Sequence, residues 1–213
     1  MQKIDLPNWN RKILYEKFSQ FNSPFFNICA DVDVTRLREY VKTNNLSFFQ
    51  AAFFLNLKTI HSIENFRLRI VEDAIIKYDV IDGSCPILRE DGETFNYCVL
   101  DYFPDFEKFS QNATPIIDKA RKAKTINPGS LRTDIIHSSI IPWVSFHSFE
   151  HAKKIDSNDT CPKIVMGKYF SENGKIKMPL SVAGHHALMD GVHVGLYFKK
   201  LQELLDAPEK HLK

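Results

Sequence analysis

The chain has 213 residues, of which 44% are hydrophobic, so it can bury one large core, and we predict a single domain over residues 1–213. Lysine and arginine (28) nearly balance aspartate and glutamate (26), and a net charge of +2 gives no reason to expect a nucleic-acid partner. No apolar run approaches the roughly 20 residues of a membrane helix, and the N-terminus lacks a signal-peptide core, so we expect a cytoplasmic protein without a membrane partner.

The first half of the chain alternates helical and strand-like patterns. Apolar residues at helical spacing predict helices over 11–21, 34–43 and 47–60, the last with Ser47 as its N-cap. A strand is expected over 25–32. The segment 66–95 breaks into short strands around Gly83 and at Asp91 and Gly92, a dipeptide typical of a hairpin.

The second half adds the remaining strands. A helix is predicted over 104–123 with an interruption near Pro115, and strands over 135–149, 164–170 and 175–182. The last two strands are joined by a turn at 172–174, and an amphipathic helix occupies 192–205. Together the elements indicate an α/β fold with a mixed sheet and helices on at least one face.

The pattern His-His-x-x-x-Asp-Gly at 185–191 carries the chemistry. It follows an apolar strand, and a strand sends adjacent side chains to opposite faces, so His185 and His186 cannot both enter one cleft. Asp190 stands four residues after His186, and Gly191 permits a tight turn. This arrangement is typical of a general base whose surroundings are fixed by a buried carboxylate.

Metal and redox sites are not favoured. His185, His186, Asp190 and His193 are ligand types for zinc, but adjacent histidines on a strand do not easily face one ion, so we expect no metal. The four cysteines form no Cys-x-x-Cys pair, which argues against a zinc knuckle or a redox pair. Four buried free thiols are expected instead.

The chain resembles the trimeric chloramphenicol acetyltransferases that use a catalytic histidine. The resemblance rests on the histidine motif and on three further stretches: Trp-Asn-Arg-Lys at 9–12, Pro-Trp-Val-Ser-Phe-His-Ser-Phe at 142–149, and Met-Gly-Lys-Tyr at 166–169 followed by Met-Pro-Leu at 178–180. It covers nearly the whole chain. It implies the CoA-dependent acyltransferase fold, a two-layer sandwich in which helices cover a mixed β-sheet.

The resemblance also implies roles for individual residues. His186 is expected to be the general base that takes a proton from a substrate hydroxyl, with acetyl-CoA as co-substrate and no metal. Asp190 is expected to pair with Arg11 and brace the histidine turn. Ser139 is expected to donate to the oxyanion, with Ser138 as the alternative if the strand register slips by one residue.

Binding residues and assembly are implied in the same way. The acceptor pocket is expected at Phe18, Phe26, Phe95 and Phe149. Acetyl-CoA is expected to contact Trp143, Lys168 and Tyr169. The chain supplies only half of the cleft that longer relatives build, so a homotrimer with sites at the subunit interfaces is implied, with Phe26 and Phe149 on the wall that faces the base of another copy.

Several pocket positions depart from the family pattern. His137 replaces an asparagine, Val165 a threonine, Asp159 a tyrosine and Lys163 an apolar residue, while Gly184 and Met189 replace a valine and a cysteine near the base. These changes keep a second hypothesis open, an acyltransferase of the same fold with a different hydroxyl acceptor. A dihydrolipoyl acyltransferase core and a catalytically silent binding protein are weaker alternatives.

Overall fold

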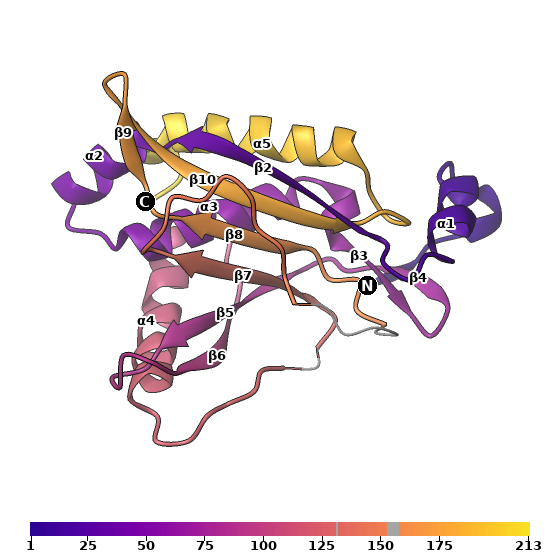
Figure 1. Ribbon diagram of the computed structural model, residues 1–213, viewed down its shortest axis with the longest axis horizontal. Coiled ribbons are helices and arrows are strands. Elements are labelled where there is room, and N and C mark those ends of the chain that lie inside the picture. The colour runs from indigo at the N-terminus through magenta and orange to yellow at the C-terminus, as the bar shows by residue number, and fades with distance from the viewer. Residues whose placement is uncertain (131, 153–157) are drawn as a thin grey trace.

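A computed structural model describes residues 1–130, 132–152 and 158–213. Its centre is a mixed sheet in which β7 runs parallel to β5 and β8, while the other neighbours are antiparallel (Figure 1). In spatial order the strands are β2 (Phe25–Asp33), β10 (Lys175–His185), β8 (Lys163–Gly167), β7 (Ile135–Ile141), β5 (Asp82–Leu88) and β6 (Phe95–Leu100), with β9 (Phe170–Glu172) paired to β10.

Helices cover one face of this sheet, called here the helix face (Figure 1). They are α2 (Thr35–Thr43), α3 (Phe48–His61), α4 (Phe106–Lys122) and α5 (Gly191–Asp206). Helix α3 is apolar on nearly all sides and lies in the core, where it packs against α2, α4 and α5. Ser47 caps it, as predicted, by accepting a hydrogen bond from the Gln50 backbone N–H. The α/β prediction of a mixed sheet covered by helices is confirmed.

On the opposite face, called here the loop face, no helix lies among the residues that the structure describes. The chain after β7 crosses in front of it (Figure 1). The side-chain amide of Asn27 on β2 donates to the Phe149 carbonyl over 2.7 Å, and the Lys168 backbone N–H donates to the Val144 carbonyl over 2.9 Å, which holds this segment to the sheet. Because strand side chains alternate, His137, Ser139, Lys163 and every second neighbour face this side.

A small second sheet supports the histidine turn. It consists of β1 (Gln2–Lys3), β4 (Ala74–Lys77) and β3 (Leu68–Val71), beside helix α1 (Lys12–Phe18) and the short 3-10 helices Leu6–Asn8 and Glu64–Arg67; a third, Pro208–Lys210, ends the chain. Leu188 packs with Leu68 and Ile75 in a separate apolar cluster. The turn that follows the two histidines is therefore anchored to the N-terminal part of the chain.

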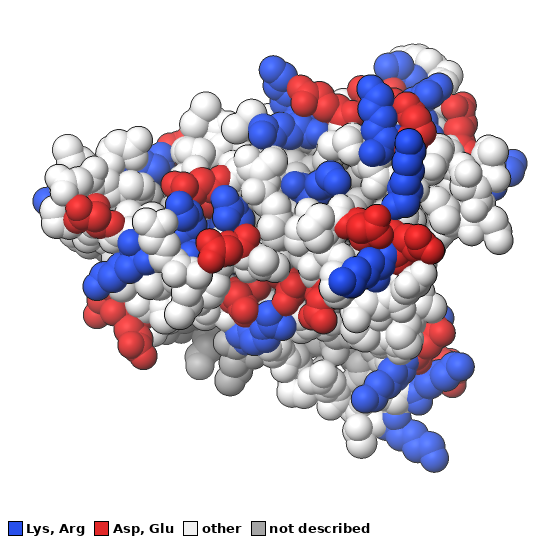
Figure 2. Space-filling model, turned by 180° about the vertical axis from the view of Figure 1, so that it is seen from behind, with Lys and Arg blue, Asp and Glu red and all other residues white. Residues whose placement is uncertain are grey.

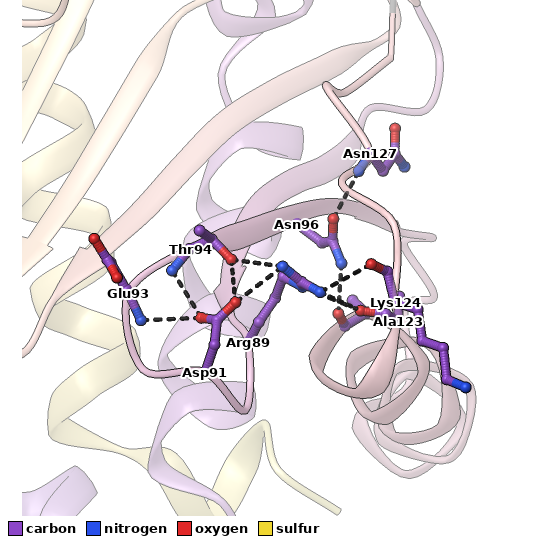
Figure 3. Close-up of polar contacts among 9 residues, drawn as sticks. Arg89, Asp91, Glu93, Thr94, Asn96, Ala123, Lys124 and Asn127 are labelled. Carbon is purple, nitrogen blue, oxygen red and sulfur yellow. Dashed lines mark hydrogen bonds and ion pairs between the residues drawn. The ribbon is translucent and has the colours of Figure 1, made fainter.

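The Asp91–Gly92 hairpin is confirmed (Figure 3). Gly92 has a φ of 72°, which a glycine adopts without strain. The Asp91 carboxylate accepts hydrogen bonds from the Thr94 hydroxyl and from the backbone N–H groups of Glu93 and Thr94, and these bonds lower its pKa to about 2. Arg89 ties the hairpin to the end of α4 by donating to the Ala123 carbonyl.

Three local predictions are wrong for identifiable reasons. Gly83 does not mark a break but lies inside β5. A glycine is needed at this position because a Cβ there would stand 2.3 Å from the Phe53 ring. Pro115 does not interrupt α4, since it lies on the exposed side while Ala113 and Ile117 keep the buried side continuous. The strand predicted over 135–149 ends at Ile141.

The positions of the cysteines and of the surface charges can also be compared with what the sequence predicts. All four cysteines are free thiols, but Cys85 and Cys98 face each other across β5 and β6 with their sulfurs 3.5 Å apart, a pairing that the sequence spacing did not reveal. Figure 2 shows basic and acidic side chains interspersed over the helix-covered side, as the near-neutral net charge predicts. Among the described residues, no helix combines the length and apolarity needed to span a bilayer.

Candidate active site

His186 directly follows β10, and its imidazole packs against two phenylalanine rings. It stacks on Phe18 with ring centroids 3.9 Å apart and an interplanar angle of 3°, and the Phe26 ring lies 4.8 Å away. The His186 backbone N–H donates to the Pro24 carbonyl over 2.8 Å. Nδ1 is buried without a hydrogen-bond partner in the described part of the chain, so aromatic packing fixes the ring orientation.

His185 lies on the other side of the chain and has a different environment. It is 6% exposed and its ring meets the edge of Phe25. Burial, reinforced by the nearby Lys163 and opposed by Asp159, lowers the pKa of His185 to about 4, so it is neutral at pH 7 and a weak base. Its Nδ1 accepts the Ala187 backbone N–H over 3.3 Å, a structural role. Since the two imidazoles do not converge, they do not form a common metal site.

An ion pair joins the N-terminal segment to the histidine turn. Arg11 Nη1 donates to Asp190 Oδ2 over 2.8 Å, so the structure brings these two residues together as predicted. Asp190 is also the N-cap of α5 and accepts the Val192 backbone N–H over 3.3 Å. Partial burial raises the pKa of Asp190, but the hydrogen bond and charge of Arg11 outweigh it and hold that pKa below its usual value.

The prediction that the Asp190 carboxylate is buried needs correction. Its side chain is 27% exposed and that of Arg11 is 11% exposed, because α5 begins at the surface. His193 completes the cap, since its Nδ1 accepts the Asp190 backbone N–H over 3.1 Å. His193 therefore has a capping role at the start of α5, which the sequence did not reveal.

Two departures from the family pattern compensate each other. A Cβ on Gly184 would stand 2.4 Å from the Met189 sulfur, so the larger Met189 fills the space that a side chain at 184 would need. Met189 is fully buried. The pair therefore keeps this position closely packed against the Phe26 ring.

Ser139 faces the loop side of β7, and Ser138 faces the helices. Ser139 is half-buried, whereas the Ser138 hydroxyl is buried without a partner in the described regions. The register pairs Ser139 with Val165, and Val165 with Ser181 on β10. The alternation therefore places Ser139, and not Ser138, on the face where a substrate has access.

Ser139 and His186 do not meet within one chain. His186 lies five residues beyond Ser181, roughly 16 Å along the strand, and β7 is two strands from β10, about 10 Å across. The separation is then on the order of 19 Å. One chain does not assemble both groups around one reacting atom.

The four phenylalanines that were predicted to bind the acceptor lie in three different places in the chain's structure. Phe18 and Phe26 contact His186 of their own chain, so Phe26 belongs beside the base and not on the wall that faces another copy's base. Phe149 lies on the loop face, where its ring packs against Phe146 and His151. Phe95 is 46% exposed near the far edge of the sheet, on β6, and joins none of them.

Of the three residues predicted to contact acetyl-CoA, Lys168 and Tyr169 directly follow β8, and Trp143 belongs to the segment that is hydrogen-bonded to Lys168. The Lys168 carbonyl accepts from Ser145 Oγ over 2.8 Å, and Trp143, which is exposed, precedes Ser145 by two residues. Tyr169 stacks under Arg38, whose guanidinium carbon lies 4.3 Å from the ring centroid. Sequence reasoning missed Arg38, which is distant in sequence and adds a second cation to this patch.

A group of metal-ligand types lies on the loop face. Ligand atoms of His137, Asp159 and Cys161 lie within 4.8 Å of one another. However, Lys163 Nζ bonds Asp159 Oδ2 over 2.5 Å, and the fully buried guanidinium of Arg69 adjoins Cys161. Two cations beside one carboxylate oppose a third cation, so the cluster does not fit a metal ion.

The comparison with known families decides the classification. A family model described as chloramphenicol acetyltransferase matches residues 1–202. The chain belongs to the chloramphenicol acetyltransferase family.

Individual chloramphenicol acetyltransferases match the chain over nearly their full length. The chain is 27% identical to "Chloramphenicol acetyltransferase 3" of Escherichia coli, covering 98% of both. A solved "chloramphenicol acetyltransferase" superposes with a TM-score of 0.89 at 29% identity, covering 96% of this chain and all of the other. The dihydrolipoamide acetyltransferase of Azotobacter vinelandii matches with a TM-score of 0.69 at 14% identity, which shows that the acyltransferase fold extends beyond the chloramphenicol acetyltransferase family.

Proposed function

We propose that this chain is an acetyl-CoA-dependent O-acetyltransferase that acetylates a hydroxyl of chloramphenicol and so inactivates the antibiotic. Family membership supports the reaction. The observation that carries the assignment is His186, an imidazole oriented by Phe18 and Phe26 on a turn that the Arg11–Asp190 pair braces. Within the described part of its own chain, no serine or cysteine is hydrogen-bonded to His186, which favours direct transfer over a covalent enzyme intermediate.

The His186 imidazole and the Ser139 hydroxyl account for the steps of the proposed reaction. The His186 imidazole takes the proton of the acceptor hydroxyl as that oxygen attacks the thioester carbonyl of acetyl-CoA. The Ser139 hydroxyl donates a hydrogen bond to the oxygen that becomes negative in the tetrahedral intermediate. The C–S bond then breaks, and the imidazolium returns its proton to the leaving thiolate of CoA.

The separation of Ser139 from His186 supports a shared site. We place His186 of one chain opposite Ser139 of the partner subunit, in three equivalent clefts of a homotrimer. Closed cyclic symmetry gives each copy the same neighbour and leaves no site incomplete. Phe18 and Phe26 then flank the base, while Phe149 lines the partner's wall; Phe95, at the distant edge, is no longer assigned to the pocket.

Acetyl-CoA is assigned to the patch of Trp143, Lys168 and Tyr169, to which Arg38 is added. Lys168 and Arg38 suit the phosphates of CoA, and the exposed Trp143 ring suits its pantetheine arm. We keep the prediction of a cytoplasmic location, where acetyl-CoA is made.

A second candidate is an acyltransferase of the same fold with another hydroxyl acceptor. The observation that favours it is the Asp159–Lys163 ion pair beside His137 on the loop face, at positions where the family resemblance implies neutral side chains. An apolar aryl group does not match this polarity.

The test is CoA release from acetyl-CoA with chloramphenicol and with a panel of other alcohols, and mass spectrometry of the products. Acetylated chloramphenicol, lost in His186→Ala, is the expected result. Acetylation of other alcohols but not of chloramphenicol would establish the second candidate. Transfer to no acceptor, dihydrolipoamide included, would favour a silent binding protein.

A further inference from the structure

The segment that crosses the loop face after β7, residues 142–149, is hydrogen-bonded to the sheet near each of its ends (Figure 1). In its first half, the Ser145 hydroxyl donates to the Lys168 carbonyl over 2.8 Å, within the patch assigned to acetyl-CoA. At its last residue, the Phe149 carbonyl accepts from the side-chain amide of Asn27 over 2.7 Å. Lys168 follows β8 whereas Asn27 lies on β2, and β10 runs between these two strands. The two ends of the segment are therefore held by different strands.

The Asn27 amide has three partners, which fix its orientation. Its nitrogen donates to the Phe149 carbonyl and, over 3.4 Å, to Cys29 Sγ on the same strand. Its oxygen accepts from Ser181 Oγ on β10 over 2.8 Å, and Ser181 is fully buried. A carbonyl can only accept, so the amide nitrogen must be the end that faces Phe149, and the Ser181 hydroxyl donates to the other end. Asn27 thus connects the crossing segment to two strands of the sheet.

The Phe149 ring is restrained together with its carbonyl. It packs against the Phe146 ring with centroids 5.7 Å apart. Phe146 in turn lies close over β8, because a Cβ on Gly167 would stand 2.9 Å from the Phe146 ring. The hydrogen bond from Asn27 and the contact with Phe146 therefore act together on the position of Phe149, the residue assigned to the wall of the acceptor pocket.

Asn27 can be changed without disturbing the base of its own chain. The preceding residue, Phe26, packs against His186, but adjacent residues of a strand point to opposite faces of the sheet. The packing of Phe26 on the imidazole should therefore survive a substitution at position 27. Asn27 is exposed, so water can replace the hydrogen bonds that a substitution removes, and we expect little loss of stability.

We propose that Asn27 is a positioning residue for the acyl acceptor: it holds Phe149 in place on the wall of the acceptor pocket, and Ser181 orients its amide. The inference rests on the proposed function, which assigns Phe149 to that wall. A wall contacts the acceptor equally in the ground state and in the transition state, so loosening it changes KM and leaves kcat unchanged. The effect should be confined to the acceptor, because acetyl-CoA is assigned to the other end of the crossing segment.

The test measures kcat, the KM of acetyl-CoA and the KM of the acceptor, which is chloramphenicol or the panel alcohol that the wild type acetylates. Asn27→Asp keeps the size of the side chain and an oxygen for the Ser181 hydroxyl, but it turns a second oxygen toward the Phe149 carbonyl. The KM of the acceptor should rise about fivefold or more, the equivalent of one hydrogen bond. The other two constants should stay within about twofold of wild type. Ser181→Ala should raise the same KM by a smaller factor.

Two further variants test whether the effect is specific to Asn27. Ser145→Ala releases the hydrogen bond near the other end of the segment and should leave the KM of the acceptor unchanged. Asn44→Ala is the matched control, since Asn44 is also an exposed asparagine whose amide donates to a carbonyl, that of Tyr40 over 2.9 Å. It should change none of the three constants. The midpoint of thermal unfolding should stay within about 2 °C of wild type in Asn27→Asp.

An unchanged KM of the acceptor in Asn27→Asp overturns this inference and leaves the proposed function standing. A joint change of all three constants with a lower unfolding midpoint also overturns it, because Asn27 would then be structural, and so does an equal rise of the acceptor's KM in Ser145→Ala. Equilibrium binding of chloramphenicol, measured by ligand-observed NMR, covers the case of transfer to no alcohol. Binding that Asn27→Asp weakens would then support the inference while acetyl transfer fails, whereas equal binding or none would overturn both.

Discussion

Arg11 and Asp190 are 179 positions apart in the chain, yet Arg11 Nη1 donates to Asp190 Oδ2 over 2.8 Å. This contact closes the N-terminal segment onto the turn that carries His186. Because Phe18 stacks on His186 and belongs to the helix that begins just after Arg11, the ion pair also places the aromatic ring that orients the base. We therefore expect stability and catalysis to depend on the same hydrogen bond.

Arg11→Val and Asp190→Asn should each lower the free energy of unfolding by about 1–3 kcal/mol, less than for a fully buried pair because Asp190 is 27% exposed. Acetyl transfer should fall in the same variants. Denaturant unfolding and steady-state kinetics measure the two effects. The exposed pair of Arg121 and Asp118 is the control, and Arg121→Leu should change neither. Unaltered activity in both site variants would show that the pair does not brace the base.

His186→Ala should reduce acetyl transfer by about 10²–10⁴-fold, the range for loss of a general base, while the protein stays folded and still binds acetyl-CoA. His185→Gln is the matched control. The glutamine oxygen can accept the Ala187 N–H in place of Nδ1, so turnover should stay within about tenfold of wild type. The opposite ranking would assign the base to the wrong histidine.

Ser139→Ala should lower kcat by about 10²-fold or more with little change in the KM of acetyl-CoA, since its hydrogen bond forms mainly in the transition state. Ser138→Ala should leave kcat unchanged and should not destabilise the fold, because the Ser138 hydroxyl is buried without a partner in the described chain. Kinetics and thermal unfolding of the two single variants check both statements. Damage from Ser138→Ala alone would mean that β7 is shifted by one residue.

His185 should make the fold sensitive to mild acid. Its pKa is lowered by burial to about 4, below the unfolded value of about 6.5, so between these values the unfolded chain binds the extra proton. Stability is then complete above pH 6.5 and is lost as the pH falls toward 4, by an amount on the order of 3 kcal/mol. His185→Gln should flatten this part of the unfolding free energy measured against pH. An unchanged slope would contradict the assignment.

The sequence predicted the parts of the site that depend on short-range pattern. Strand alternation separated His185 from His186, and the family resemblance paired Arg11 with Asp190. The choice between Ser139 and Ser138 stayed open until the register of β7 and β8 was known. Positions that depend on distant contacts were not predictable in this way. The local sequence predicts a break at Gly83, because the Phe53 ring that requires a glycine there lies on another element. It predicts an interruption at Pro115, because the packing that keeps α4 continuous involves residues distant in sequence. Cys85 and Cys98 became neighbours only through the register of β5 and β6.

The division of the site between chains leads to a test by complementation. A homotrimer should sediment at three times 24.7 kDa. Ser139→Ala chains keep His186, and His186→Ala chains keep Ser139, so a mixed trimer of the two should contain one intact cleft among three. Co-expression of the two inactive variants should therefore restore a substantial fraction of wild-type activity, whereas the double variant expressed with either of them should not. Each variant trimer alone supplies the baseline. Activity that stays at the baseline in isolated mixed trimers, or a fully active monomer, would contradict a shared site, because both results require Ser139 and His186 to act within one chain.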